Sequence, residues 1–513
     1  MPDTYLLVPM PPTPNGRMHI GHGGGTYLRS DVAARALRVR GADVHIVSGT
    51  DVYENWVVAE AERIGLSADE TCALYHRGID SDLRALGVEM DVWLDPRDPE
   101  HLDAYREVHE QALDALRAGG GARLVPERVP FSLTTGRELV GTWIAGRCPY
   151  CGASAGGSSC TACSEHFQPE ELVDPRSRLD DSPLVWEERQ HWFAYPTDVG
   201  LLLTDVAGAG LRPHVAEPAG RYLRSREGRI RLSGQGTWGV RSASVPDDAV
   251  LANGYYLYAV YCGEVFSRRT GQANPFRAAS DVVTVGFFGS DNSTPGLVAP
   301  RVLAQGSAGA LRAFDWTVVN GMLHFEGQKC STSKRHGIWL GELLDSGAVS
   351  ADELRFTLAA AGLDHGTDDL SLRGLVDRTR TLRRWTADVL VPALDGAAGS
   401  PAAWSGDIEK ALDAQNEALD LHTMDVPAAT AVLEGWMTAR GTDTGAWLLG
   451  LALLAEPILP VLARQVWDSL GLPAGPTVAT ARQGATVGGS RVVAPCSDVT
   501  EDELARYVHR AAA

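Results

Sequence analysis

The chain lacks any run of eighteen consecutive apolar residues, and its first residues show no basic region followed by an apolar stretch. The first absence argues against a membrane-spanning helix, because a helix needs about 20 apolar residues to cross a bilayer. The second argues against a secretory signal peptide. We therefore expect a cytoplasmic protein.

Positive charge is also scarce in this chain. There are 46 lysines and arginines against 65 aspartates and glutamates, which gives a formal net charge of −19. This balance argues against broad, nonspecific binding to nucleic acid, but it does not exclude one basic face. Arg35, Arg38 and Arg40 form one small basic group, and Lys334 with Arg335 forms another. Neither group is dense enough to predict a nucleic-acid interface.

Cysteine is rare, and four of the eight cysteines are grouped. The group reads Cys148-x-x-Cys151 and, after eight further residues, Cys160-x-x-Cys163. Two such pairs place four thiolates around a tetrahedral ion, the geometry that zinc prefers. Disulfides are disfavoured in a cytoplasmic protein. The spacing therefore predicts a structural Zn²⁺ site, since four protein ligands leave no position for a substrate.

The first fifty residues predict a doubly wound α/β fold. An apolar strand at residues 4–9 is followed by a Pro-rich turn, a helix at residues 23–40 and a second strand at residues 43–48. This order of elements opens a parallel sheet of the Rossmann type, which binds ligands at the carboxyl ends of its strands.

The rest of the chain, within a length of 513 residues, suggests further domains. Amphipathic helices are expected at 55–118, strands at 255–260 and 282–288, and a hairpin at 318–325. Helices are expected from residue 352 to about 472, with a linker at 396–406, and a short acidic helix follows near the end. We divide the chain into a catalytic domain (1–118 and 245–330), an insertion carrying the cysteines (119–244), a connecting region (331–372), a helical bundle (373–472) and a tail (473–513).

One motif follows the first strand, where His19-Ile20-Gly21-His22 comes after a Pro-Asn-Gly turn. Histidines spaced i and i+3 at a helix start can both face a triphosphate beside the positive end of the helix. Gly21 has no side chain to keep an adenine ring from the backbone. The alternative interpretation is a polar helix cap, but the strand before the motif favours nucleotide binding.

Two further segments are candidates for the same site. Asp51 ends the second strand; it can cap a helix that starts near Tyr53, or it can hold a ligand. Far along the chain, the segment Lys329-Cys330-Ser331-Thr332-Ser333-Lys334-Arg335 forms a basic, hydroxyl-rich loop. Its lysines are suited to neutralising a leaving pyrophosphate.

Taken in this order, the motifs resemble those of the class I aminoacyl-tRNA synthetases of the methionyl type, over residues 4–470. The resemblance identifies the first motif as HIGH and the second as a KMSKS-like loop in which Thr332 replaces the second lysine. It implies activation of an amino acid with ATP and Mg²⁺. The expected catalytic residues are His19, His22, Lys329 and Lys334. The expected ATP-binding residues are Pro12, Asn15, Gly21, His22, Asp291, Lys329, Ser331 and Ser333.

The expected amino-acid pocket departs from the family pattern. Pro11 and Thr13 stand where the family has leucine and tyrosine, and Gly296 stands where it has histidine. The family's tryptophan segment aligns loosely with residues 259–263 and has lost its tryptophan. The substrate-binding residues expected from this alignment are Pro11, Thr13, Asp51, Ala259, Cys262 and Gly296, with Asp51 holding the α-ammonium. Because several large side chains are missing, methionine is an unfavourable substrate.

These departures suggest a specialised relative of the family. The leading hypothesis is an enzyme that adenylates an amino acid other than methionine and passes the acyl group to a small hydroxyl or amine acceptor without tRNA. The resemblance extends to the synthetase-like part of hydrazine-forming enzymes, which implies a separate cupin-type partner. The alternatives are a methionine–tRNA or other aminoacyl–tRNA ligase and a catalytically silent binding protein. The expected assembly is a monomer or a homodimer.

Overall fold

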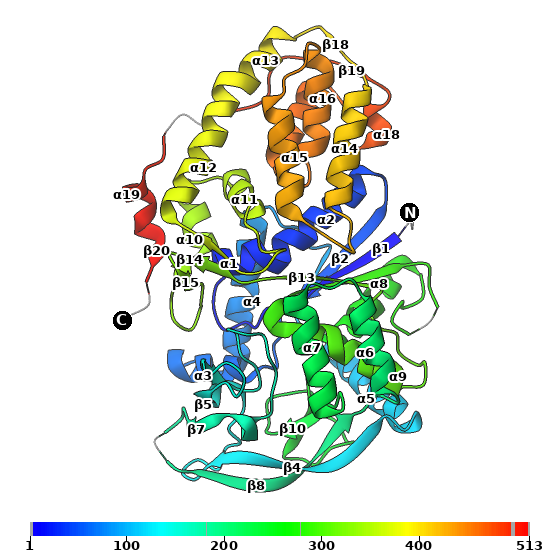
Figure 1. Cartoon of the computed structure of the whole chain (residues 1–513), viewed down its shortest axis with the longest axis vertical. Coiled ribbons are helices and arrows are strands. Elements are labelled where there is room, and N and C mark those ends of the chain that lie inside the picture. Colours follow the sequence, from blue (N-terminus) through cyan, green and yellow to red (C-terminus); the bar gives the residue numbers. More distant parts are fainter. Residues whose placement is uncertain (1–3, 181, 278, 494–497, 511–513) are drawn as a thin grey trace.

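The core of the protein is a five-stranded sheet in the order β13–β12–β1–β2–β3, with every neighbouring pair parallel (Figure 1). The computed structural model describes residues 4–180, 182–277, 279–493 and 498–510. The strands of the sheet are β1 (Thr4–Pro9), β2 (Asp43–Gly49), β3 (Val92–Leu94), β12 (Val283–Gly289) and β13 (Trp316–Asn320).

Helices cover both faces of this sheet. Alternate residues of β1 enter two separate cores, with Leu7 in one and Leu6 and Val8 in the other. The flanking helices are α1 (Ile20–His22), α2 (Leu28–Val39), α3 (Asn55–Ile64), α4 (Ala68–Ala85), α5 (Leu102–Ala118), α8 (Tyr255–Thr270) and α9 (Ala299–Gly306). A sheet buried on both faces confirms the predicted doubly wound class.

The insertion begins at a run of three glycines, Gly119 to Gly121, and Figure 1 shows it at the bottom of the molecule. Its elements are β4 (Ala122–Ser132), β5 (Ile144–Arg147), β6 (Ser154–Gly156), β7 (Val173–Ser177), β8 (Leu184–Ala194), α6 (Val199–Gly208), α7 (Pro213–Arg226), β9 (Ile230–Arg231), β10 (Ser233–Gln235) and β11 (Ala249–Leu251). The long strands β4 and β8 pair antiparallel along their whole length. The strands β6, β5 and β7 form a small separate sheet around the cysteine group.

The C-terminal part is a helical bundle, at the top of Figure 1. Its helices are α10 (Leu340–Asp345), α11 (Ala351–Ala359), α12 (Leu372–Trp385), α13 (Val391–Gly396), α14 (Gly406–Ala418), α15 (Val426–Thr438), α16 (Thr444–Ala455), α17 (Pro460–Ser469), α18 (Val478–Ala481) and α19 (Glu501–Leu504). Short strands accompany them: β14 (Leu323–Phe325), β15 (Gln328–Lys329), β16 (Gly337–Ile338), β17 (Asp368–Leu370), β18 (Pro401–Ala402), β19 (Ala485–Thr486) and β20 (Val508–His509). The helix α16 is buried from residue 445 to its end, so it is the central helix of the bundle.

Buried ion pairs join the bundle to the catalytic sheet. The guanidinium of Arg355 on α11 lies 2.7 Å from the carboxylate of Asp31 on α2, and both side chains are almost fully buried. Arg29, also on α2, pairs with Asp364 at the same distance. Pairs of this kind fix geometry more than they add stability, because burying each charge costs nearly as much as the pairing returns.

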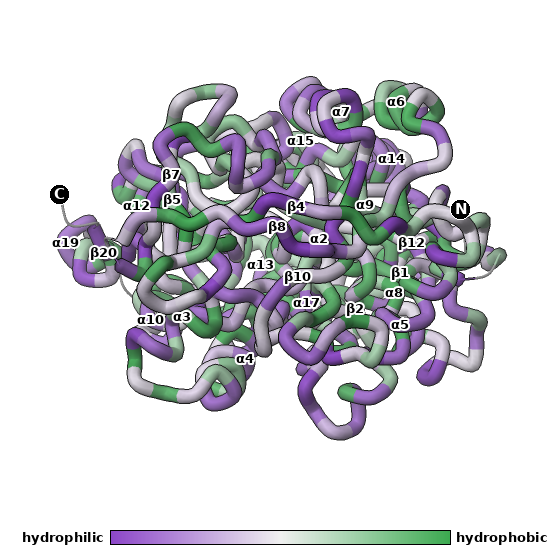
Figure 2. The backbone as a smooth tube through the Cα atoms, turned by 90° about the horizontal axis from the view of Figure 1, so that it is seen from below, coloured by the Kyte–Doolittle hydropathy of each residue, from purple (hydrophilic) through white to green (hydrophobic). Residues whose placement is uncertain are grey.

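The structure corrects two predicted elements. Residues 255–260 begin the helix α8 and do not form a strand, because a short apolar run is compatible with a buried helix as well as with a strand. In Figure 2 the segments around β1 and α8 are largely hydrophobic. Residues 318–325 do not form a hairpin: β13 belongs to the central sheet, and β14 pairs with β15 and β17 in another sheet.

No helix in the described part of the chain is both long enough and apolar enough to cross a membrane. The division into domains that we drew from the sequence stays a prediction.

Candidate active site

The two histidines of the first motif stack on each other at the start of α1. Their ring centroids lie 3.7 Å apart with 12° between the planes. The backbone N–H of His22 donates to Nδ1 of His19 at 3.3 Å, and the backbone N–H of His19 donates to Nδ1 of His22 at 3.4 Å. Since each Nδ1 accepts a hydrogen bond, the Nε2 atoms carry the ring protons and are the available donors.

Both rings are neutral at physiological pH. Burial and, to a smaller extent, the nearby Lys329 together lower the pKa of His22 to about 4. The pKa of His19 is also lowered, first by burial and then by His22. Two neutral N–H donors can therefore bind phosphate oxygens without carrying a positive charge into the site.

Replacing His22 with alanine should lower ATP–pyrophosphate exchange at least tenfold with folding unchanged, because one of the two donors is lost. His45→Ala is the matched control, since that ring pairs with Asp43 at the far end of β2. Exchange rates measured beside circular dichroism spectra test this expectation. Near-normal exchange by the His22 variant would reject the assignment of the phosphate site.

The KMSKS-like loop packs against the first motif and lines the same cavity. Nζ of Lys329 lies 3.3 Å from the carboxylate of Asp291, which follows β12. A Cβ added to Gly16 would lie 2.3 Å from the methyl group of Thr332, so the tip of the loop packs on the Pro-Asn-Gly turn. A Cβ on Gly21 would lie 2.9 Å from Cβ of Cys330. Both glycines therefore permit the loop and the first motif to approach closely.

Asp51 lies just after the carboxyl end of β2 and is held by a partly buried chain of polar side chains. The side-chain amide of Asn253 donates to the Asp51 carboxylate, and its amide oxygen accepts from the hydroxyl of Tyr105. The backbone N–H of Asp51 donates to the carbonyl of Pro12 at 2.9 Å. The alternative role as a helix cap is wrong, because α3 begins at Asn55 with Glu54 in the cap position.

Asn253→Ala should raise the KM for the amino acid about tenfold and leave the KM for ATP unchanged. The variant removes a hydrogen bond to a charged group, which is worth about 1.5–3 kcal/mol. Tyr105→Phe, which removes only the donor to Asn253, should have a smaller effect. Exchange measured at varied concentrations of each substrate separates the two constants, and an unchanged amino-acid KM would show that Asp51 does not bind this substrate.

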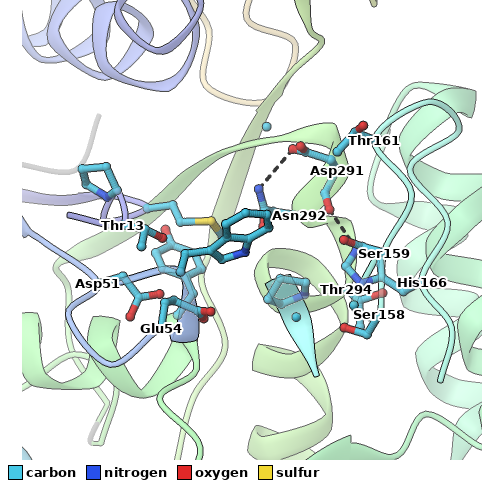
Figure 3. Close-up of a pocket in the computed structure, with 18 of the residues that line it drawn as sticks. Thr13, Asp51, Glu54, Ser158, Ser159, Thr161, His166, Asp291, Asn292 and Thr294 are labelled. Atoms are coloured by element: carbon cyan, nitrogen blue, oxygen red, sulfur yellow. Dashed lines mark hydrogen bonds between the residues drawn. The ribbon is translucent and has the colours of Figure 1, made fainter. Parts of the chain in front are cut away.

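These groups surround one cavity of about 1170 Å³ (Figure 3). Figure 3 shows Thr13, Asp51 and Glu54 on one side of it, with Asp291 and Asn292 facing them across the space. The cavity wall includes thirteen residues singled out from the sequence: Pro11, Pro12, Thr13, Asn15, His19, Gly21, His22, Asp51, Asp291, Lys329, Ser331, Ser333 and Lys334.

Three expected pocket residues do not reach this wall. Ala259 and Cys262 are fully buried in the core between α8 and the sheet. Gly296 packs against Phe288, whose ring would lie 2.6 Å from an added Cβ. The loose alignment of the tryptophan segment misplaced this part of the pocket. The residues that line it instead are Asn253, Tyr255, Tyr256 and Leu257, and they could have been found as the polar and aromatic stretch directly after the strand β11.

The four grouped cysteines fit a tetrahedral metal. Their sulfur atoms all lie within 4.8 Å of one another, and the Cys148–Cys163 and Cys151–Cys160 pairs are each 3.7 Å apart. A Zn–S distance of about 2.3 Å places the sulfurs of a tetrahedral site about 3.8 Å apart. The donor set and the spacing therefore both suit the zinc expected from the sequence.

The loop held by these cysteines, residues 148–169, forms part of the cavity wall. Ser158, Ser159, Thr161 and His166 line it, and Figure 3 shows them opposite Asp51. Nε2 of His166 donates to the carbonyl oxygen of Asp291 at 2.9 Å, while burial lowers the pKa of this ring to about 4. A hydrogen bond thus connects the loop that carries the cysteines to Asp291, whose carboxylate pairs with Lys329.

Known proteins are similar to this chain in sequence and in fold. The sequence model of the family described as tRNA synthetases class I (M) matches residues 6–381. The methionine–tRNA ligase of Roseiflexus castenholzii is 28% identical over 407 residues, which cover 74% of this chain and 66% of that protein. The methionine–tRNA ligase of Chlorobaculum tepidum is 25% identical over 533 residues, which cover 92% of this chain and 74% of that protein. The first match thus spans about two thirds of the relative's length.

Among solved structures, the crystal structure of Mycobacterium tuberculosis methionyl-tRNA synthetase bound by methionyl-adenylate has a TM-score of 0.69 with this chain. The two are 17% identical in sequence, and the match covers 97% of this chain and 100% of that one. Because the two sequences are only 17% identical, the structural match establishes the fold alone. The family assignment rests on the sequence model that matches residues 6–381. The chain belongs to the class I aminoacyl-tRNA synthetases, in the methionyl-tRNA synthetase group.

Proposed function

We propose that the protein is an ATP-dependent ligase that forms an aminoacyl adenylate and passes the acyl group to tRNA. One observation carries this proposal: the stacked histidines, the Lys329–Asp291 pair and Asp51 all face the same cavity. The methionine–tRNA ligases that match the chain support tRNA as the acceptor. The transfer to a small acceptor and the cupin-type partner expected from the sequence find no support among these relatives.

In the first step, a carboxylate oxygen of the amino acid attacks the α-phosphorus of ATP. The bond to the bridging oxygen of the β-phosphate breaks, and pyrophosphate leaves with that electron pair. Protein groups contribute by positioning and by stabilising the negative charge that develops on the phosphates. In the second step, a hydroxyl of the acceptor attacks the acyl carbon and AMP leaves.

The geometry suggests a role for each group. Nε2–H of His19 and His22 would bind phosphate oxygens, and Lys329 would leave Asp291 to neutralise the departing pyrophosphate. Asp51, fixed by Asn253, would orient the α-ammonium of the amino acid. We expect Mg²⁺ to accompany ATP, and the zinc of the insertion to act only on structure.

The relatives favour methionine as the amino acid. A second candidate is an amino acid other than methionine, and the polarity of the pocket favours it. Thr13 and Glu54 line the cavity beside Asp51 (Figure 3), and Asn253, which also lines it, donates a hydrogen bond to the Asp51 carboxylate. A thioether offers no strong hydrogen bond to the Glu54 carboxyl group, so burying a thioether against it would leave that polar group unpaired.

The test is ATP–pyrophosphate exchange across a panel of amino acids, followed by acylation of total tRNA with each amino acid that exchanges. We expect exchange with at least one amino acid and transfer of its label to tRNA. Exchange without any acylation of tRNA would restore the small-acceptor hypothesis. Absence of exchange with every amino acid would contradict the proposed activity.

A further inference from the structure

The cavity contains a second carboxyl group beside Asp51, at a residue that the sequence analysis did not single out. Glu54 lies three residues after Asp51, in the turn that leads into α3, and its side chain lines the cavity. In Figure 3 the carboxyl groups of Asp51 and Glu54 lie beside each other below Thr13.

Few protein groups in the described part of the chain pair with these two carboxyl groups. Asp51 accepts a hydrogen bond from the neutral amide of Asn253. Among the described residues, none forms an ion pair or a side-chain hydrogen bond with Glu54, whose backbone carbonyl accepts from Val57. Lys329, which lines the same cavity, is paired with Asp291. This end of the pocket therefore brings two carboxyl groups together without a protein cation between them.

Burial makes this arrangement unfavourable in the absence of a ligand. It raises the pKa of Asp51 well above its usual range, and the neighbouring Glu54 raises it further. Burial also raises the pKa of Glu54. A ligand that brings positive charge to both groups would reverse these shifts, because an opposite charge within hydrogen-bond distance favours the ionised form. The α-ammonium of an amino acid supplies one such charge, at Asp51.

We infer that Glu54 is a specificity-determining residue, and that the substrate is an amino acid whose side chain carries a second ammonium group. This inference rests on the proposed function. Asp51 takes the α-ammonium and Glu54 takes the side-chain ammonium. The hydroxyl of Thr13 and the amide of Asn253 add polar groups beside the two carboxyl groups, and these suit a cationic side chain better than a thioether.

The inference is tested by binding and by exchange. Calorimetry without ATP compares diamino acids of increasing length (2,4-diaminobutyrate, ornithine and lysine) with methionine and norleucine. ATP–pyrophosphate exchange is then measured with the same compounds. Both assays use the wild-type protein and the Glu54→Gln variant. Glu62→Gln is the control, because Glu62 lies on α3, the helix that follows Glu54, and its half-exposed carboxylate pairs with Arg137.

We expect at least one diamino acid to bind and exchange better than methionine. Glu54→Gln should lower kcat/KM for that diamino acid at least tenfold, leave the KM for ATP unchanged and shift the preference toward uncharged amino acids. Glu62→Gln should behave like the wild type.

Three results would overturn the inference. Exchange that prefers methionine and is unaffected by Glu54→Gln would reject the inference and leave the proposed function intact. An equal loss for methionine and for diamino acids would show that both carboxylates hold the α-ammonium. Failure of every diamino acid to bind would also reject it. Binding of a diamino acid that depends on Glu54, with no exchange, would instead support the pocket assignment and reject the proposed activity.

Discussion

Replacing Lys329 with alanine should lower the rate of ATP–pyrophosphate exchange by about 10²–10³-fold. That range is typical for the loss of one group that stabilises developing charge in a water-excluded site. Lys329 is well placed for this role, because it lies at the cavity wall with its Nζ 3.3 Å from Asp291. Exchange measured at saturating ATP and amino acid isolates the effect on kcat.

The composition of the chain provides an unusually clean control for this experiment. Lysine occurs only at positions 329, 334 and 410, while arginine supplies the rest of the 46 basic residues. Lys410 is 83% exposed on α14, where its ammonium lies 3.9 Å from Asp407. Lys410→Ala should therefore exchange at the wild-type rate. An equal loss in the Lys329 and Lys410 variants would point to a general effect of removing charge, and a normal rate in the Lys329 variant would remove this residue from the mechanism.

The same series tests how the loop works without the second lysine of its motif. Thr332 occupies that place, and its methyl group packs on Gly16, so it brings no charge to the site. Lys334 lines the cavity two residues later. Lys334→Ala should reduce exchange more than tenfold if Lys334 supplies the second charge, and a normal rate would mean that Lys329 acts alone.

The sequence predicted the parts of this site that local chemistry defines. The HIGH histidines and Asp51 each follow a strand of the parallel sheet, so the topology of the fold alone brings them to one edge. Lys329 is distant in sequence, and its placement needed the family resemblance. The cysteine spacing was sufficient by itself, because four thiolates at short intervals have few other uses.

The pocket wall could not be predicted in the same way. Residues 255–260 have an apolar pattern that fits a strand or a buried helix, and the choice depends on the core into which they pack. Once they form α8, its first turn faces the cavity while Ala259 and Cys262 turn inward. Glu54 carried no signal in the sequence, since a glutamate near a helix start is ordinary. Its importance comes from its place beside Asp51 at the cavity wall, which only the folded chain shows.

The second prediction with a large effect concerns the loop that carries the four cysteines. This loop supports activity only by holding one wall of the cavity in place. Cys160→Ser should abolish binding of zinc, unfold part of the insertion and lower exchange at least about 100-fold. Cys160 is almost fully buried in a small core, whose other buried members are Leu139, Ile144, Cys148, Ala155, Phe167 and Leu172. A core of this size provides little stability alone, whereas a structural zinc site contributes about 10–16 kcal/mol of binding free energy.

The loss of activity follows from the position of the loop in the site. Residues 154–159 and His166 form one wall of the cavity, and His166 holds the carbonyl of Asp291, the partner of Lys329. When the loop unfolds, water enters the site and Asp291 loses this support. Metal analysis, limited proteolysis within residues 119–244 and exchange rates measure the three effects together. Cys72→Ala is the control, because that thiol is buried in a different core and should leave the zinc content unchanged. Normal exchange by a zinc-free Cys160 variant would show that the wall is not required for activation.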